Sequence, residues 1–139
     1  LFIYDGSTWV EVGNQDSAAT DAQTISFNYT APGGGFGGIE TVNLANISPG
    51  ARIVDVSVEV NTALSNYTGA TEPTVEVGTA SDLDQFMTGD ESDLSATGTY
   101  TANPNYLYPA VQTVDLSLKA KISHRTATAG AFVVTVTYV

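Results

Sequence analysis

Apolar and polar residues alternate one by one along three long stretches, which read IVDVSVEV at 53–60, VQTVDLSLKAKI at 111–122 and AFVVTVTYV at 131–139. A period of two in β-branched and aromatic residues is typical of β-strands that turn one face toward a core. Sheets with one dry face and one wet face are commonly antiparallel. The pattern therefore predicts antiparallel strands. The residues predicted to face the core are Val54, Val56, Val58, Val60, Val114, Leu116, Leu118, Ile122, Phe132, Val134, Val136 and Tyr138.

Shorter runs of the same character lie between turn signals, and they predict further strands at 23–29, 39–44, 73–78 and 99–102. About nine strands with closely spaced turns and almost no helix are typical of two packed sheets. We therefore predict an all-β fold, an antiparallel β-sandwich of jelly-roll or Ig-like type. The short connection at 124–130 further predicts that the two long strands on either side of it pair as a hairpin.

The N-terminal segment is predicted to form an arm. Residues 2–4 and 9–12 are short aromatic and β-branched runs on either side of the turn residues 5–8, which predicts a hairpin. Small and polar residues then connect this hairpin to the next strand. An isolated two-stranded hairpin is marginally stable in water. We therefore predict two units, a hairpin and linker arm at 1–21 that packs on another surface and a β-sandwich domain at 22–139.

The amino-acid composition argues against several classes of binding partner and excludes all cysteine-based sites. The formal net charge is −11, and a surface of that sign repels phosphate, so neither nucleic acid nor an anionic membrane is an expected partner. The chain has no Cys, which excludes disulfides, thiolate metal sites and cysteine nucleophiles. No apolar stretch reaches the length of a membrane span, so membrane insertion is not expected.

The sequence offers no group of residues patterned for catalysis. His124 lies in a short connection, which predicts an exposed turn residue rather than a catalytic base. The region 79–93 breaks the β pattern, with Ser81 predicted to cap a single helical turn and five carboxylates between Asp82 and Asp93. Oxygen ligands suit Ca²⁺, but the spacing does not match an EF-hand loop, and a solvated acidic loop is the expectation. We predict no enzyme activity, no metal and no cofactor.

Apolar side chains near turns are the candidates for binding a partner. The loop at 31–38 (APGGGFGG) holds five glycines around one Phe. It is either a mobile surface loop or a loop that carries Phe36 to a partner surface. The arm is expected to contribute buried side chains to a contact between subunits, and the segment 106–109 is expected to present two tyrosines. The predicted partner-binding residues are Phe2, Ile3, Tyr4, Trp9, Phe36, Tyr106 and Tyr108.

Two sets of residues resemble structural proteins of tailed bacteriophages. Tyr4-Asp5-Gly6 followed by Trp9-Val10 resembles the YDGxxWV hairpin that recurs in tail-fibre and other virion proteins of this class. The strand at 53–60, the run PTVEVGTA at 73–80 and the closing VTVTYV are similar to a β-module of a phage virion. The resemblance implies a protein that decorates a capsid or forms part of a tail fibre, acts by binding, and assembles as a trimer or another symmetric oligomer.

We therefore expect a non-enzymatic structural protein located in the virion of a tailed phage. Its expected partners are other virion proteins or copies of itself, as a homotrimer, together with a host surface glycan. The alternative is a carbohydrate-binding β-sandwich module that stacks its aromatic residues on the sugars of a receptor or polysaccharide. A hydrolase in which two carboxylates converge in space is the least favoured class.

Overall fold

The computed structural model describes residues 2–4, 9–11, 22–103 and 116–139. Within these ranges every strand pairing is antiparallel, and no helix is long and apolar enough to cross a membrane. The elements are β1 (Phe2–Tyr4), β2 (Trp9–Glu11), β3 (Gln23–Thr30), β4 (Ile39–Ile47), β5 (Ile53–Ser65), β6 (Thr74–Thr79), the 3₁₀ helix η1 (Gly89–Glu91), β7 (Gly98–Thr101), β8 (Leu116–Ser123) and β9 (Ala129–Tyr138). The predicted all-β antiparallel class is confirmed.

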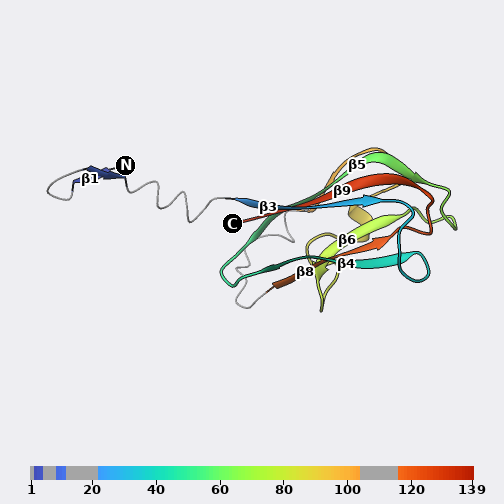
Figure 1. Ribbon diagram of the computed structural model, residues 1–139, viewed down its shortest axis with the longest axis horizontal. Helices are drawn as coiled ribbons and strands as arrows, with labels where there is room; N and C mark the ends of the chain where they lie inside the picture. The colour runs from blue at the N-terminus through green and yellow to red at the C-terminus, as the bar shows by residue number, and fades with distance from the viewer. Residues whose placement is uncertain (1, 5–8, 12–21, 104–115) are drawn as a thin grey trace.

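Two sheets pack face to face around one core (Figure 1). One sheet has the order β3-β9-β5-β7 and the other the order β4-β8-β6. Consecutive strands from β3 to β9 therefore alternate between the sheets. An Ig-like sandwich keeps several pairs of consecutive strands within one sheet, whereas crossing between layers at every connection suits a double-sheet jelly roll. The topology thus selects the jelly-roll alternative.

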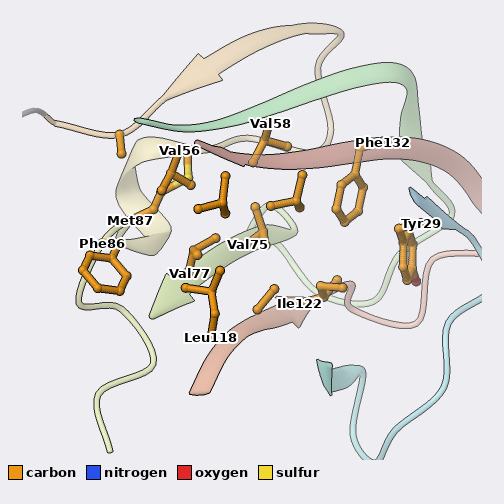
Figure 2. Close-up of a cluster of buried hydrophobic side chains, with 14 of the residues drawn as sticks. Tyr29, Val56, Val58, Val75, Val77, Phe86, Met87, Leu118, Ile122 and Phe132 are labelled. Atoms are coloured by element: carbon orange, nitrogen blue, oxygen red, sulfur yellow. The ribbon is translucent and has the colours of Figure 1, made fainter. Parts of the chain in front are cut away.

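The inward side chains of both sheets meet in a dry interior (Figure 2). Val58 and Phe132 come from the larger sheet and Val77, Leu118 and Ile122 from the smaller one, and all five are at most 1% exposed. The alternation predicted for the long strands is confirmed along β8 and along β9 as far as Val136, whereas Tyr138 is only partly buried against the core. Val114 lies outside the described residues.

One predicted core position is displaced by a β-bulge. Ile53 is buried and Val54 only partly so, because the register of β5 against β9 shifts between Ile53 and Asp55. A bulge adds one residue to a strand and so changes which residues face the core. The prediction for Val54 is therefore wrong, whereas Val56 and the later members of the series are buried as predicted.

The predicted hairpin between the two long C-terminal strands is wrong. β8 pairs with β4 and β6, and β9 pairs with β3 and β5, so the two strands lie in opposite sheets. Arg125 and Thr126, in the connection, have φ values of 53° and 60°. A strand in the middle of a sheet has both edges occupied, so two such strands joined by a short connection lie across the core from each other.

The chain after β6 covers the free edge of that strand. Val77 donates its N–H to the Met87 carbonyl and accepts the Met87 N–H, both at 3.0 Å. Ser92 Oγ accepts the Val75 N–H at 2.9 Å and donates to the Val75 carbonyl at 3.1 Å. The segment 80–92, which contains η1, therefore covers this edge like an irregular extra strand, and the outer N–H and C=O groups of Val75 and Val77 are satisfied by the chain itself.

The helical turn predicted at Ser81 is absent from this covering segment. The single 3₁₀ turn of the described residues begins at Gly89, and the Glu91 carboxylate accepts the Thr88 N–H at 2.9 Å. Phe86 and Met87, which follow Ser81, are both buried against the core. Pairing with β6 satisfies the backbone here, and this pairing outweighs the local helical signal.

The predicted N-terminal hairpin is confirmed, because β1 pairs with β2 and Tyr4 lies opposite Trp9. This hairpin is a sheet of its own, and its two strands pair only with each other within the described residues. In Figure 1 it is drawn away from both sheets of the sandwich. The division into an arm and a domain remains a prediction.

Candidate interaction loop

The loop between β3 and β4, residues 31–38, places an aromatic side chain in solvent. Phe36 is 97% exposed, and its carbonyl accepts the Ile39 N–H at 3.3 Å. Gly35 has φ of 87°, and a Cβ at this position would lie 1.9 Å from the Ile39 carbonyl oxygen. Only glycine fits this left-handed and crowded position. The glycines therefore shape a tight turn that leaves Phe36 uncovered by the described part of the chain.

His124 is buried at the base of this loop and contacts it through Gly34, so the prediction of an exposed turn residue is wrong. The imidazole is 3% exposed, its Nε2 lies 2.7 Å from the Gly34 carbonyl oxygen, and its Nδ1 accepts the Thr126 N–H at 3.2 Å. Both contacts are satisfied only by the neutral tautomer with the proton on Nε2, which donates to Gly34. Both ring nitrogens are thus engaged by backbone groups, which suits a structural role better than that of a base.

An aromatic stack connects His124 to the core. The Tyr29 ring lies between them, with its centroid 6.1 Å from that of His124 and 4.8 Å from that of Phe132. Gly33 packs against this stack so closely that a Cβ would lie 2.2 Å from the Tyr29 hydroxyl oxygen. The base of the loop is therefore anchored to the interior of the sandwich.

The Tyr29 hydroxyl is buried without a hydrogen-bond partner among the described residues. Burial, and to a lesser extent the charge of Glu40, raises the pKa of Tyr29 to about 12. In the unfolded chain the phenol ionises near its ordinary pKa of 10.0. Above that pH the unfolded state loses this proton more readily than the folded state, so ionisation favours unfolding.

We therefore expect the folded protein to lose about 2–3 kcal/mol of stability through Tyr29 as the pH rises from 10 to 12. This contribution is fully present below pH 10. Tyr29→Phe should remove this part of the pH dependence and be neutral or slightly stabilising at pH 7, because the hydroxyl it deletes has no partner. Urea unfolding of both proteins at several pH values measures the difference. If the free energy of unfolding falls equally for both proteins between pH 10 and pH 12, the expectation is contradicted.

A second set of contacts joins the loop to two neighbouring connections. Arg125 donates its N–H to the Gly38 carbonyl at 3.0 Å, and its own carbonyl accepts the Thr68 N–H at 2.7 Å. The hydroxyls of Thr68 and Thr126 are 2.6 Å apart. Glu40 accepts the Gly34 N–H at 3.1 Å, which fixes the other side of the loop. Three connections at this end of the sandwich therefore form one hydrogen-bonded unit around Phe36.

The other predicted partner-binding residues are placed only in part. Phe2, Ile3 and Tyr4 lie on β1 and Trp9 lies on β2, so all four belong to one hairpin. The contacts of their side chains with a partner remain predictions. Tyr106 and Tyr108 lie outside the described residues. Phe36 is therefore the member of the predicted set whose exposed position the structure establishes.

The acidic residues between Asp82 and Asp93 form no metal centre. The described residues contain no group of three or more His, Asp or Glu side chains arranged to hold an ion. Asp93 accepts the Ser95 N–H at 2.9 Å and its hydroxyl at 2.5 Å. The pKa of Asp82 is raised, mainly by a side-chain hydrogen bond with Asp84 and to a lesser extent by desolvation and by the negative charge of Asp84. Asp93 therefore acts as a local turn group, as Glu91 acts as a cap group of η1.

A shallow open pocket of about 300 Å³ lies at the opposite end of the sandwich. It is lined by the connection at 46–51 together with Tyr138 and Val139, and no charged side chain contributes to it. His124 is at the other end of the sheets and takes no part in this pocket.

Sequence reasoning missed the supporting role of His124, although a signal for it was present. The inward positions of β8 are Leu116, Leu118, Ala120 and Ile122, and the same parity continues to His124. Extending the alternation by two residues beyond the last apolar one would have placed the imidazole inside. The partners Gly34 and Thr126 lack any such signal, because their contacts are made by backbone groups.

No family model and no curated protein matches this sequence. Three solved structures share its fold. A chain in the capsid of Ralstonia phage GP4 has a TM-score of 0.59 at 19% identity, covering 86% of this chain and 84% of that one. A chain of the cyanophage Pam1 capsid asymmetric unit has 0.59 at 17%, covering 85% and 84%. A chain in the acid-stable capsid of Helicobacter pylori bacteriophage KHP30 has 0.57 at 18%, covering 84% and 86%.

Proposed function

We propose that this chain is a non-enzymatic structural protein of a phage virion that acts by binding other proteins. The observation that carries the proposal is the shared fold with chains from three phage capsid structures, over at least 84% of both partners in each comparison. The YDGSTWV hairpin at residues 4–10 supports the same class. The buried His124 and the absence of a metal group among the described residues fit binding better than catalysis.

Within that role, we propose capsid decoration before a tail-fibre module, because the similar structures are all capsids. The sandwich would contact the capsid surface through Phe36, and the arm at 1–21 would pack on a neighbouring subunit. An exposed Phe on a turn held by backbone hydrogen bonds loses little conformational freedom on binding, which favours affinity. A homotrimer, as the resemblance implies, is one form such an assembly can take.

Immunogold electron microscopy of purified particles, with an antibody against the sandwich, tests this proposal. Label over the heads supports capsid decoration, and label on the tails supports the fibre alternative. Intact particles that lack the chain by mass spectrometry would overturn the virion role. The aromatic residues keep a carbohydrate-binding module as the second candidate, and glycan-array binding that is lost with Trp9→Ala or Tyr106→Ala would support it.

Phe36→Ala should weaken binding of the chain to particles that lack it by at least about tenfold, since exposed aromatic anchors often cost 2 kcal/mol or more on truncation. The free energy of unfolding should change by less than about 0.5 kcal/mol, because the side chain is almost fully exposed. Co-sedimentation with particles and urea unfolding measure the two effects.

Gly35→Ala tests whether the turn that presents Phe36 is needed for binding, and Gly34→Ala is its matched control. The first places a Cβ 1.9 Å from the Ile39 carbonyl oxygen at a positive φ, whereas the second has no atom closer than 3.9 Å. Gly35→Ala should therefore reduce binding by distorting the turn, and Gly34→Ala should leave it intact. Equal binding by Phe36→Ala and the wild type would remove this loop from the contact.

A further inference from the structure

The sandwich has four sheet edges within its described residues, and three of them are protected against further pairing. β7 is only four residues long, β6 is covered by the segment that follows it, and β4 carries a bulge between Asn43 and Ala45 together with the charge of Glu40. Short strands, coverage, bulges and charges are the usual means by which edges avoid pairing with other chains. The exception among these four is β3.

β3 reads QTISFNYT, eight residues with no charge and no proline. Its register with β9 runs from Gln23 to Thr30 without a shift. A long, straight and uncharged edge is a template for another strand. In a chain of net charge −11, an uncharged strand is also a place where two copies can approach without bringing carboxylates together.

The hydrogen-bond pattern identifies the backbone groups that face outward. Ala31 donates its N–H to the Gly130 carbonyl at 2.9 Å, directly beyond the pair of Thr30 with Ala131. Hydrogen-bonded and non-hydrogen-bonded pairs alternate along an antiparallel ladder. Ile25, Phe27 and Tyr29 therefore bond to β9. The residues whose N–H and C=O groups point away from β9 are Thr24, Ser26, Asn28 and Thr30.

We propose that β3 pairs antiparallel with β3 of a second copy of this chain, about a two-fold axis at Phe27. This register places Ser26 opposite Asn28 and Thr24 opposite Thr30 of the second copy. All eight outward groups of each β3, two on each of four residues, are then paired. The two four-stranded sheets become one continuous sheet across the dimer.

The side chains suit this register. Thr24, Ser26, Asn28 and Thr30 are exposed on one face, where Thr–Thr and Ser–Asn pairs can form cross-strand hydrogen bonds. On the other face Ile25 and Phe27 are only partly buried at the margin of the core, and a second copy would cover them. The inference concerns the sandwich alone and does not depend on the proposed virion role.

The test is the mass of the full chain by sedimentation velocity over a range of concentrations. The wild type is expected to show a concentration-dependent dimer. In the proposed register residue 26 of one copy lies opposite residue 28 of the other. Combining Ser26→Lys with Asn28→Lys therefore places two ammonium groups opposite each other across the dimer contact and should raise the dissociation constant at least tenfold. Combining Ser26→Lys with Asn28→Glu places opposite charges at the same positions and should retain the dimer. Thr99→Lys with Thr101→Lys, exposed on β7, is the control and should behave as wild type.

Amide hydrogen exchange gives an independent readout. The amides of Thr24, Ser26, Asn28 and Thr30 should gain protection as concentration rises, whereas those of Ile25, Phe27 and Tyr29 should be protected throughout.

A chain that stays monomeric, one that forms only trimers, or a dimer that the double lysine variant leaves intact would overturn the proposal. The last result would point to another occupant of the dimer contact, such as the arm. The immunogold labelling that tests the virion role does not depend on these outcomes, so the virion role and the β3 dimer can fail separately.

Discussion

Phe132→Ala is expected to lower the free energy of unfolding by about 3–5 kcal/mol, as is typical for removal of a buried aromatic ring. Phe132 is 1% exposed, pairs with Tyr29 and Val60 on its two neighbouring strands, and stacks on the Tyr29 ring at 4.8 Å. The substitution removes apolar burial, leaves a cavity and takes support from the stack beneath His124. Urea unfolding followed by fluorescence and circular dichroism measures the loss.

Val133→Ala is the matched control, because Val133 is the next residue of β9 and lies on the outer, partly exposed face. It should cost clearly less than Phe132→Ala. Natural domains are stable by only about 5–15 kcal/mol. If Phe132→Ala leaves too little folded protein to measure, Phe132→Leu supplies a smaller loss at the same site. Similar losses for Val133→Ala and Phe132→Leu would contradict the inward assignment of β9.

Gly78→Ala is expected to destabilise by at least about 1–3 kcal/mol, the range for adding a methyl group where there is no room. A Cβ on Gly78 would lie 2.1 Å from the Asp82 carbonyl oxygen and 2.6 Å from the Leu83 carbonyl carbon. Both atoms are backbone, so relief requires the covering segment to move. That movement would break the bond from the Thr79 N–H to the Asp82 carbonyl, now 2.8 Å long.

Loss of this cover exposes the edge of β6, so Gly78→Ala should also increase self-association. Thermal unfolding reports the stability, and light scattering reports the aggregation. Gly89→Ala is the control in the same segment, since its Cβ would approach only the side chains of Glu76 and Thr74, at 3.3 Å. If both alanine variants are equally stable and equally soluble, the segment does not act as a cover.

The alternating pattern predicted the class of fold because burial on one face imposes a period of two on a strand. The same pattern contains no information about which strands pair. β8 and β9 are joined by a short connection and look like a hairpin, yet each lies in the middle of a different sheet. Their partners come from distant parts of the chain, and packing of the two layers decides the arrangement.

The candidate site could be predicted only where a side chain carries the signal. Phe36 stands among glycines in a loop expected at the surface, and its 97% exposure agrees with that expectation. Whether the loop carries Phe36 to a partner surface stays a prediction. The burial of His124 under this loop could have been predicted from the alternation of β8, but its hydrogen bonds could not, because the Gly34 and Gly38 carbonyls and the Thr126 N–H are backbone groups with no signal in the sequence. The contacts of Phe2, Ile3, Tyr4 and Trp9, and the roles of Tyr106 and Tyr108, remain predictions.

The order of strands in the larger sheet has a consequence for biosynthesis. β9, the last strand of the sandwich among the described residues, lies between β3, its first strand, and β5. During translation β3 therefore has no neighbour on that side until Ala129–Tyr138 have left the ribosome. Such long-range pairing makes folding slow. A nascent chain stalled before Ala129 should be sensitive to protease, and the sandwich should close only once β9 has emerged from the ribosome.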